Sequence, residues 1–255
     1  IRDFCLSRGL GDVYKRQLLD ILCDGSKCCG GIIRWPDGRE EQVEADYVIL
    51  ATGGIGGTYK HSTNFKHLTG DGVEIARRHN IELKNLDYVQ IHPTTLYSDN
   101  KEERSFLISE SVRGEGARLY DKNMNRFVDE LLPRDLLTQE IYKQMEKDGT
   151  DFVWEDLRTI PRDELISHFP NIIEHCSQAG YDVFHECIPI VPAQHYFMGG
   201  IKVNHNSKTS MDHLYAVGET ACNGVHGKNR LASNSLLESL VFAKRAAKEI
   251  AGERR

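Results

Sequence analysis

The apolar positions of this chain follow two spacings, one typical of buried strands and one of amphipathic helices. Short apolar runs between glycine turns predict strands at 18–23, 32–35 and 42–50, with a turn at Pro36-Asp37-Gly38. The run 48–51 is apolar without alternation, which is typical of a strand buried on both faces, and it leads directly into Thr52-Gly53-Gly54. We therefore expect this strand to end at a ligand.

Helical spacing recurs further along the chain. The segment 133–147 begins with proline and places Leu136, Leu137, Ile141 and Met145 on one predicted apolar face. The last helix is the clearest, because Ser233 or Asn234 can cap it and basic residues gather near its end. A short strand is expected at 213–219, ending in Gly218 and Glu219. Helices are predicted at 71–78, 133–147, 161–169, 171–179 and 233–251.

Strands that alternate with glycine turns and helices predict an α/β fold. The chain has 255 residues and an apolar fraction of 40%, which suffices for one large or two modest domains. No run reaches the roughly 18 to 20 apolar residues of a membrane-spanning helix, so no membrane association is expected. The net charge of −6 argues against a nucleic-acid surface. An anion site would have to be built locally from Arg, His and backbone N–H groups.

The seven cysteines are odd in number and contain no CxxC pair, so neither a disulfide framework nor a metal site is predicted. Cys28 and Cys29 are adjacent and could suggest a metal or redox pair. The neighbouring Gly25, Gly30 and Gly31 instead favour a loop. Reduced thiols in a cytoplasmic protein fit this pattern best.

The first 17 residues lack the pattern of a signal peptide, a helix or a strand. The segment 12–17 matches the in-frame translation of a transposon end used to prepare sequencing libraries. Residues 1–17 are therefore predicted to be a non-native leader and are excluded from the fold.

Four glycine-bearing or helix-start segments could approach a cofactor, although each taken alone is explained by ordinary turn geometry. A helix N-terminus carries unpaired N–H donors and suits negative charge on a bound cofactor. No G-x-G-x-x-G loop is present, since Tyr14 and Tyr59 stand where a third glycine belongs. The four segments are Thr52-Gly53-Gly54, Gly70-Asp71-Gly72, Gly218-Glu219 and Asn234-Ser235-Leu236.

A second set of residues suits a dicarboxylate, because arginine forks bind carboxylates and histidine or hydroxyl groups complete the oxygens. Purely structural roles for these residues stay open. Arg134 could be a solvated charge, each histidine could be a structural residue, and Glu110 or Glu115 could pair with Arg113 or Arg118. The candidates are His92, Ser109, Glu110, Arg134, His195 and Arg230.

The ordered motifs of the chain resemble those of the succinate dehydrogenase, fumarate reductase and L-aspartate oxidase flavoprotein superfamily. The segments 126–134 and 190–195 look most like the aspartate oxidase branch. The motifs are His92-Pro-Thr94, Glu110-x-x-Arg-Gly-Glu-Gly116, Pro133-Arg-Asp135, His195-Tyr-x-Met-Gly-Gly200, Gly218-Glu219 and His226-Gly-x-Asn-Arg-x-x-x-Asn-Ser235.

The resemblance implies a partial, Rossmann-like FAD-binding domain interrupted by an α+β capping domain. The FAD-binding parts would be 18–88, lacking the N-terminal G-x-G-x-x-G unit, and 195–255, with the capping domain at 89–194. The implied flavin-binding residues are Thr52, Gly53, Asp71, Glu219, Ser235 and Leu236.

The same resemblance places His92, Ser109, Glu110, His195 and Arg230 at the substrate. It gives catalytic roles to Arg134, His195, Arg230 and His92. Arg134 is the family's proposed proton donor or acceptor, a role that would need a relay through a neighbour such as Asp135. Ser109 stands where the family commonly has threonine.

The implied reaction is FAD-dependent oxidation of L-aspartate to iminoaspartate, the first step of NAD synthesis, with hydride transfer to flavin N5 and reoxidation by oxygen or fumarate. A cytoplasmic setting and quinolinate synthase as pathway partner follow from the resemblance. The nearest alternative is the flavoprotein subunit of a succinate dehydrogenase or fumarate reductase. From a different class, the chain could be an inactive fragment or a dicarboxylate-binding module without redox activity, with weak FAD binding and a tendency to aggregate.

Overall fold

The computed structural model describes residues 16–100 and 104–253. The predicted leader therefore lies outside the described residues except for Arg16 and Gln17, as do Cys5 and the segment Gly9 to Tyr14. The Arg16 guanidinium lies 3.4 Å from the centre of the Trp35 ring.

The N-terminal strands form a three-stranded antiparallel sheet in the order β1-β2-β3. Cys28 and Cys29 lie within the second of these strands, so their predicted placement in a loop is wrong. The physical reason is close packing. Gly30 approaches the third strand so closely that an added Cβ would lie 2.1 Å from the Val43 carbonyl oxygen, and the Cys28 side chain is fully buried. The strands are β1 (Gln17–Asp24), β2 (Lys27–Arg34) and β3 (Glu40–Glu44).

The predicted strand at 42–50 is two strands, because the chain leaves the first sheet after β3 and enters another at β4 (Val48–Leu50). There it pairs in parallel with β12 (Leu214–Ala216). Leu50 is 1% exposed but Ile49 is 47% exposed, so the prediction of burial on both faces is wrong for Ile49. The described residues leave about half of the Ile49 side chain uncovered.

The structure has two halves, each with its own hydrophobic core. The half that contains β1–β4 and β12 has a core formed by Ile21, Leu50, Ile75, Ile201 and Leu214, and its remaining elements surround this core. The predicted helix at 71–78 is confirmed as α1. The other members are the 3₁₀ turns η1 (Gly56–Thr58) and η2 (Gly218–Thr220), α1 (Asp71–Arg78), and the strands β5 (Leu83–Lys84), β11 (Gly200–Lys202) and β13 (Ala221–Cys222).

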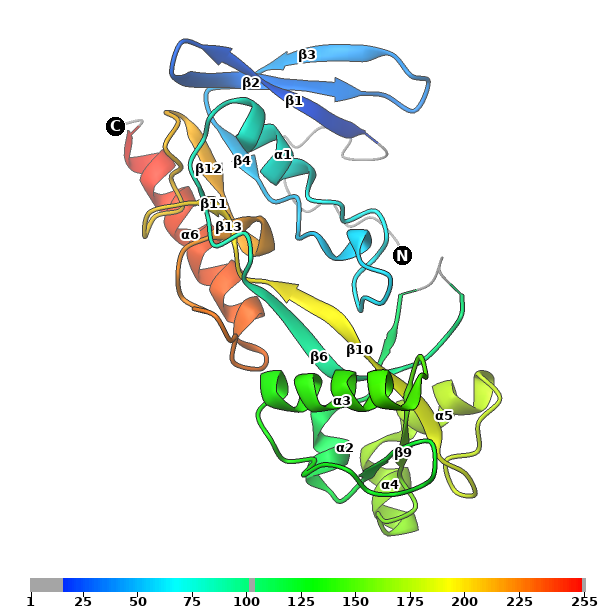
Figure 1. The fold of residues 1–255 in the computed structure, drawn as a ribbon. Helices are drawn as coiled ribbons and strands as arrows, with labels where there is room; N and C mark the ends of the chain where they lie inside the picture. Colours follow the sequence, from blue (N-terminus) through cyan, green and yellow to red (C-terminus); the bar gives the residue numbers. More distant parts are fainter. Residues whose placement is uncertain (1–15, 101–103, 254–255) are drawn as a thin grey trace.

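The other half is a five-stranded antiparallel sheet, in the order β7-β6-β10-β9-β8, with helices packed around it (Figure 1). Its core contains Ile108, Leu119, Leu137, Ile141 and Ile188. The two core clusters fall on either side of the predicted boundaries near 88 and 194, which stay predictions. The strands are β6 (Val89–Leu96), β7 (Phe106–Leu107), β8 (Arg118–Tyr120), β9 (Val153–Asp156) and β10 (Ile188–Phe197). The helices are α2 (Glu110–Gly114), α3 (Arg134–Asp148), α4 (Arg162–His168) and α5 (Pro170–Gln178).

Strands β6 and β10 run side by side from one half to the other in Figure 1. They pair in antiparallel fashion, with His92 opposite Ala193 and Ile91 opposite Gln194. The register shifts on both sides of this short paired stretch, between Val191 and Ala193 and again between Gln194 and Tyr196. Such bulges bend a strand and redirect its side chains.

The final helix, α6 (Asn234–Glu253), confirms the prediction at 233–251. Phe242 and Ala246 are buried against the rest of the half. Leu236, Leu237 and Leu240 are 61–70% exposed, so they form an apolar row that the described residues leave uncovered.

Among the described residues no helix is long and apolar enough to cross a membrane. The six cysteines in this part of the chain are free thiols. No group of His, Cys, Asp and Glu side chains within 16–100 and 104–253 is arranged to hold a metal ion.

Helix α3 confirms the predicted element but corrects one position of its apolar face. Leu137 and Ile141 are fully buried, whereas Leu136 is 45% exposed. Because successive helical residues are about 100° apart, Leu136 lies outside the arc that contains Leu137, Thr138 and Ile141.

This difference gives a matched test of the core. We expect Ile141→Ala to lower the free energy of unfolding by about 2–5 kcal/mol, because it removes buried methyl groups and leaves a cavity. Leu136→Ala on the same helix should change it by less than about 1 kcal/mol. Urea unfolding of the two variants measures both values; equal losses would contradict the assigned faces.

Candidate active site

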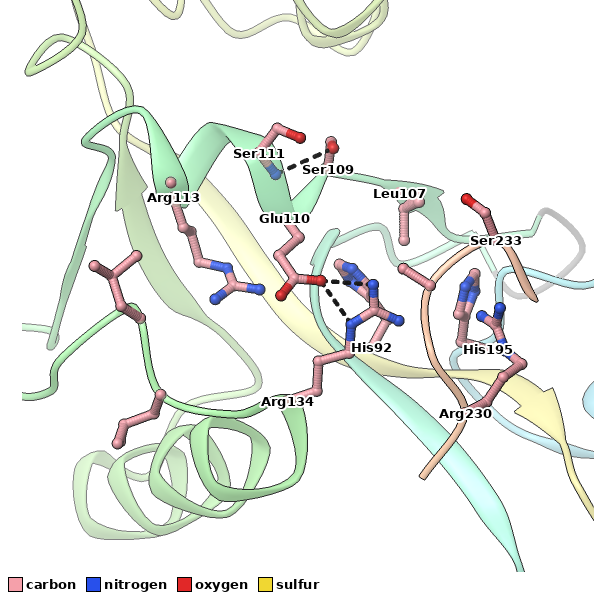
Figure 2. A pocket seen from close by; sticks show the side chains of 14 residues that line it. His92, Leu107, Ser109, Glu110, Ser111, Arg113, Arg134, His195, Arg230 and Ser233 are labelled. Atoms are coloured by element: carbon pink, nitrogen blue, oxygen red, sulfur yellow. Dashed lines mark hydrogen bonds and ion pairs between the residues drawn. The ribbon is translucent and has the colours of Figure 1, made fainter. Parts of the chain in front are cut away.

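A pocket of about 540 Å³ opens where the two halves meet (Figure 2). The structure brings all six residues of the predicted dicarboxylate set into its wall, from β6, α2, α3, β10 and the loop before α6. Arg113, which was not among the predicted site residues, also lines it. The predicted members are His92, Ser109, Glu110, Arg134, His195 and Arg230.

The two histidines face each other because β6 and β10 are neighbours. The centres of their rings are 5.5 Å apart, with the planes inclined by 68°. Nδ1 of His92 lies 3.0 Å from the Thr94 carbonyl oxygen, and Nδ1 of His195 lies 2.9 Å from the Thr63 hydroxyl oxygen. Each ring is thus held through one nitrogen.

Both histidines are neutral near pH 7. Burial is the main cause that lowers the pKa of His92 well below its ordinary value, and electrostatic interaction with the neighbouring His195 and Arg134 side chains adds to it. Burial and the neighbouring Arg230 and Arg134 lower the pKa of His195 to about 4. Neutral imidazoles can exchange hydrogen bonds with a bound anion without adding charge to it.

Arg134 begins α3 and reaches across to α2. Its Nε and Nη2 atoms donate to one oxygen of Glu110 at 2.8 and 2.6 Å. The Arg134 side chain is 14% exposed and the Glu110 side chain 51%. The Nη1 atom of Arg134 is buried without a hydrogen-bond partner among the described residues. The solvated-charge alternative for Arg134 is therefore wrong, and its carboxylate partner is Glu110 and not the exposed Asp135.

The alternative pairings proposed for the glutamates are also wrong. Glu110 bonds Arg134, and Glu115 lies 2.8 Å from Nδ1 of His168. Ser109 caps α2, since its hydroxyl oxygen accepts a hydrogen bond from the Ser111 N–H at 3.3 Å.

Arg230 lies in the loop before α6 and is 6% exposed. The Gln90 side chain, from β6, donates to the Arg230 carbonyl oxygen at 2.8 Å and so ties this loop to the paired strands. The Arg230 guanidinium lies over the Tyr196 ring, 4.7 Å from its centre, and donates to the Ser235 hydroxyl oxygen at 3.3 Å. Burial and the nearby Arg134 lower the pKa of Arg230.

The predicted flavin residues fall into two groups. In the first, the Thr52 hydroxyl donates to the Thr220 hydroxyl at 3.0 Å, and Asp71 at the start of α1 accepts from the Thr69 hydroxyl at 2.6 Å. Gly53 adopts φ 76°, in the left-handed region that favours glycine.

The second group surrounds Glu219. Its carboxylate accepts from the Phe197 N–H at 2.8 Å, and burial raises its pKa to about 7. An added Cβ at Gly54 would lie 2.4 Å from this carboxylate, so a side chain at position 54 would displace the Glu219 carboxylate from its present place. Ser235 lies in the first turn of α6 beside Arg230, and Leu236 is 70% exposed.

Sequence reasoning missed the residues that hold the predicted ones. Gln194 is buried and its side-chain oxygen accepts from Ser62 and Asn64 at 2.7 and 2.9 Å, which anchors the strand next to His195. Thr63 holds the His195 ring itself. The segment around Ser62 and Thr63 has no regular apolar spacing, so no signal in the sequence marked it.

The sequence matches the FAD binding domain family over residues 6–236. Among curated proteins it is 54% identical to the L-aspartate oxidase of Clostridium perfringens and 56% identical to that of Clostridium acetobutylicum, each over 234 residues. The match takes in 92% of this chain in both cases, but 53% and 54% of those proteins. The chain thus spans about half the length of the curated relatives it matches.

Solved structures give a parallel result. An Escherichia coli quinol fumarate reductase chain is 34% identical, with a TM-score of 0.82, over 92% of this chain and 44% of that one. A Mycobacterium smegmatis Sdh1 chain is 32% identical, with a TM-score of 0.78, over 90% of this chain and 40% of that one. A 3-ketosteroid Δ1-dehydrogenase of Sterolibacterium denitrificans, 17% identical with a TM-score of 0.65, shares the fold over 93% of this chain and 59% of that one.

The lowered pKa of His195 predicts how stability depends on pH. As pH falls, the unfolded chain binds a proton near the ordinary pKa of 6.5, whereas the folded chain binds it only near pH 4. The free energy of unfolding should therefore fall between these values, by on the order of 1–3 kcal/mol. His195→Asn should reduce the loss measured by urea unfolding at pH 7 and pH 5. Replacement of the exposed His205 by Asn should not; equal slopes in both variants would contradict the assignment.

Proposed function

This chain belongs to the FAD binding domain family, and on that basis we propose that it is the part of an L-aspartate oxidase that holds the substrate against FAD. One observation carries the proposal. Four cationic or imidazole side chains, His92, Arg134, His195 and Arg230, converge on a single pocket. Such a set can bind both carboxylates of a four-carbon dicarboxylate.

FAD is the cofactor of this family, and the residues next to the pocket fit it. Because position 54 is glycine, no side chain from it occupies the space next to the buried Glu219 carboxylate. The first turn of α6 presents backbone N–H groups beside Ser235. The residues proposed to hold FAD are Thr52, Gly53, Asp71, Glu219, Ser235 and Leu236. When bound, FAD supplies the acceptor for the hydride that leaves the substrate Cα.

The pocket residues orient the substrate. In the proposal, Arg230 and His195 bind one carboxylate of L-aspartate and His92 contributes to the other, with Ser109 near the pocket rim. Because the histidines are neutral, the arginines provide the positive charge that attracts the carboxylates, and the histidines provide hydrogen bonds that orient them. Fixing the reacting C–H bond in this way can supply several kcal/mol of catalysis, out of about 7–11 kcal/mol available from orientation.

Proton transfer is the role proposed for Arg134. The substrate amino group must lose a proton as its C–N bond becomes C=N. A free arginine, with a pKa above about 12, is a poor base. Here the guanidinium bridges the pocket and the half-exposed carboxylate of Glu110, so a proton can pass from the substrate through Arg134 to Glu110 and then to water.

The oxidase proposal is favoured over the reductase alternative by sequence identity. This chain is 54–56% identical to the two clostridial L-aspartate oxidases and 32–34% identical to the E. coli and M. smegmatis chains. Iminoaspartate formation with oxygen or fumarate as acceptor, entry into NAD synthesis, quinolinate synthase as pathway partner and a cytoplasmic location belong to the same proposal.

The chain taken by itself is proposed to bind FAD weakly, because it lacks the G-x-G-x-x-G unit, and to aggregate. Ile49 on β4 and the apolar row Leu236, Leu237 and Leu240 are exposed close to the proposed flavin residues. Apolar surface of this extent favours association between chains.

The proposal is tested on this chain extended to the full length of its relatives. We expect L-aspartate, without oxygen, to bleach the flavin absorbance, and succinate to leave it unchanged. Bleaching by succinate alone would move the protein to the dehydrogenase alternative, and an intact spectrum with both would overturn the redox function.

Arg134→Leu tests the proton path in the same protein. We expect kcat for aspartate oxidation to fall by about 100-fold or more, because a positioned acid–base group contributes about 10²–10⁴-fold. Arg162→Leu, at an exposed position of α4, is the matched control and should retain activity. Full activity of the Arg134 variant would rule out its role.

A further inference from the structure

Glu155 lies in the middle of the capping half, where a charged side chain is costly. It belongs to β9 and is 0% exposed. Its strand neighbours are apolar, with Leu119 opposite on β8 and Ile188 opposite on β10. Buried carboxylates are rare unless a cation or hydrogen-bond donors compensate them.

Neither carboxyl oxygen of Glu155 has a hydrogen-bond partner among the described residues. The cation whose charge acts on it is Arg113 of α2, which is 2% exposed. Arg113 uses Nη1 to donate to the Glu130 carbonyl oxygen at 2.6 Å, while its Nε and Nη2 atoms are buried without a partner in the described chain.

Arg113 also lines the pocket, and in Figure 2 its guanidinium points toward Glu110 and Arg134. Three carboxylates act on its charge: Glu155, Glu110 and Glu130, with Glu155 having the largest effect. Glu110 is already bonded to Arg134, and Glu130 is bonded to Arg126 and to the Leu119 N–H. Glu155 is thus the carboxyl group of the three that is left to balance Arg113.

We propose that Glu155 is a positioning residue for Arg113: from the core side it controls how much positive charge this guanidinium presents to a dicarboxylate in the pocket. When Glu155 carries a proton, the Arg113 charge is available to the pocket. When Glu155 is ionised, it draws that charge toward the core. The identity of the ligand in this inference rests on the proposed function. The coupling between Glu155 and Arg113 does not.

The groups around Glu155 make this control effective near neutral pH. Burial raises its pKa to about 8, Arg113 acts in the opposite direction, and the charge of Glu130 raises it further. Burial, followed by the charge of Glu155, raises the pKa of the Cys176 thiol on α5 to about 12. Cys176 therefore stays uncharged while Glu155 titrates.

The coupling can be measured without ligand in the full-length protein. The folded pKa of about 8 exceeds the ordinary 4.5, so the folded state keeps a proton that the unfolded chain releases, and stability falls as pH rises across this window. Glu155→Gln should gain Tm relative to the parent as pH rises from 5 to 8.5, by about 2 °C or more. Glu146→Gln, at an exposed position of α3, should show no such gain.

To test whether Arg113 is the group coupled to Glu155, the same comparison of Tm against pH is repeated in an Arg113→Gln background. Because Arg113 lowers the pKa of Glu155, its loss should move the pH window of the Tm gain upward. A gain that does not depend on pH, or a window that Arg113→Gln leaves in place, would overturn the proposal.

The effect on the pocket is measured with malonate, a dicarboxylate that has no amino group and so cannot be oxidised to an imine, through its perturbation of the flavin spectrum. The Kd of the parent protein should rise by about fivefold or more between pH 7 and pH 9, as expected for coupled sites. Glu155→Gln should keep its low Kd across this range, while Glu146→Gln follows the parent.

These outcomes separate the two hypotheses. If the parent binds malonate and Glu155→Gln shows the same pH dependence, the role of Glu155 fails and the proposed function stands. If the parent does not bind malonate, the proposed function fails, and the ligand-free Tm series still decides whether Glu155 and Arg113 are coupled.

Discussion

The antiparallel pairing of β6 with β10 is the interaction on which the rest of the site depends. It brings His92 and His195, which lie far apart in the sequence, to a ring separation of 5.5 Å. The same strands carry Gln90, which ties down the backbone of Arg230. Both strands run from one half of the structure to the other in Figure 1, and Leu96 of β6 and Ile190 of β10 belong to the core of the capping half, so packing errors there would displace the pocket.

Burial then determines which side chains of the pocket carry charge. Its imidazoles are neutral, and its arginines carry charge that is only partly balanced by carboxylates. Unpaired nitrogens on Arg113, Arg134 and Arg230 are costly in an apolar surrounding. Under the proposed function, a bound dianion pairs with those of these nitrogens that face the pocket, so part of the energy lost by leaving them unpaired is recovered as affinity for the ligand.

Much of this could be predicted from the sequence, for reasons that differ between residues. Helices α1, α3 and α6 follow from apolar spacing and terminal residues, and the six pocket residues were recognisable from ordered motifs. The placement of Cys28, Ile49 and Leu136 could not be predicted, because each depends on which neighbour covers one face. The supporting roles of Thr63 and Gln194 and the burial of Glu155 arise from contacts between segments far apart in the chain, which local patterns do not contain.

The two register shifts in β10 have a consequence for how this segment can change over time. Side chains alternate between the faces of a strand, so losing or gaining one residue turns every later side chain to the opposite face. Between Val191 and Tyr196 the bulges already offset the register twice, and His195 lies within that interval. Substitutions here would alter local packing, but a single insertion or deletion would direct the imidazole away from the pocket. The spacing of this segment is therefore less free to vary than its composition.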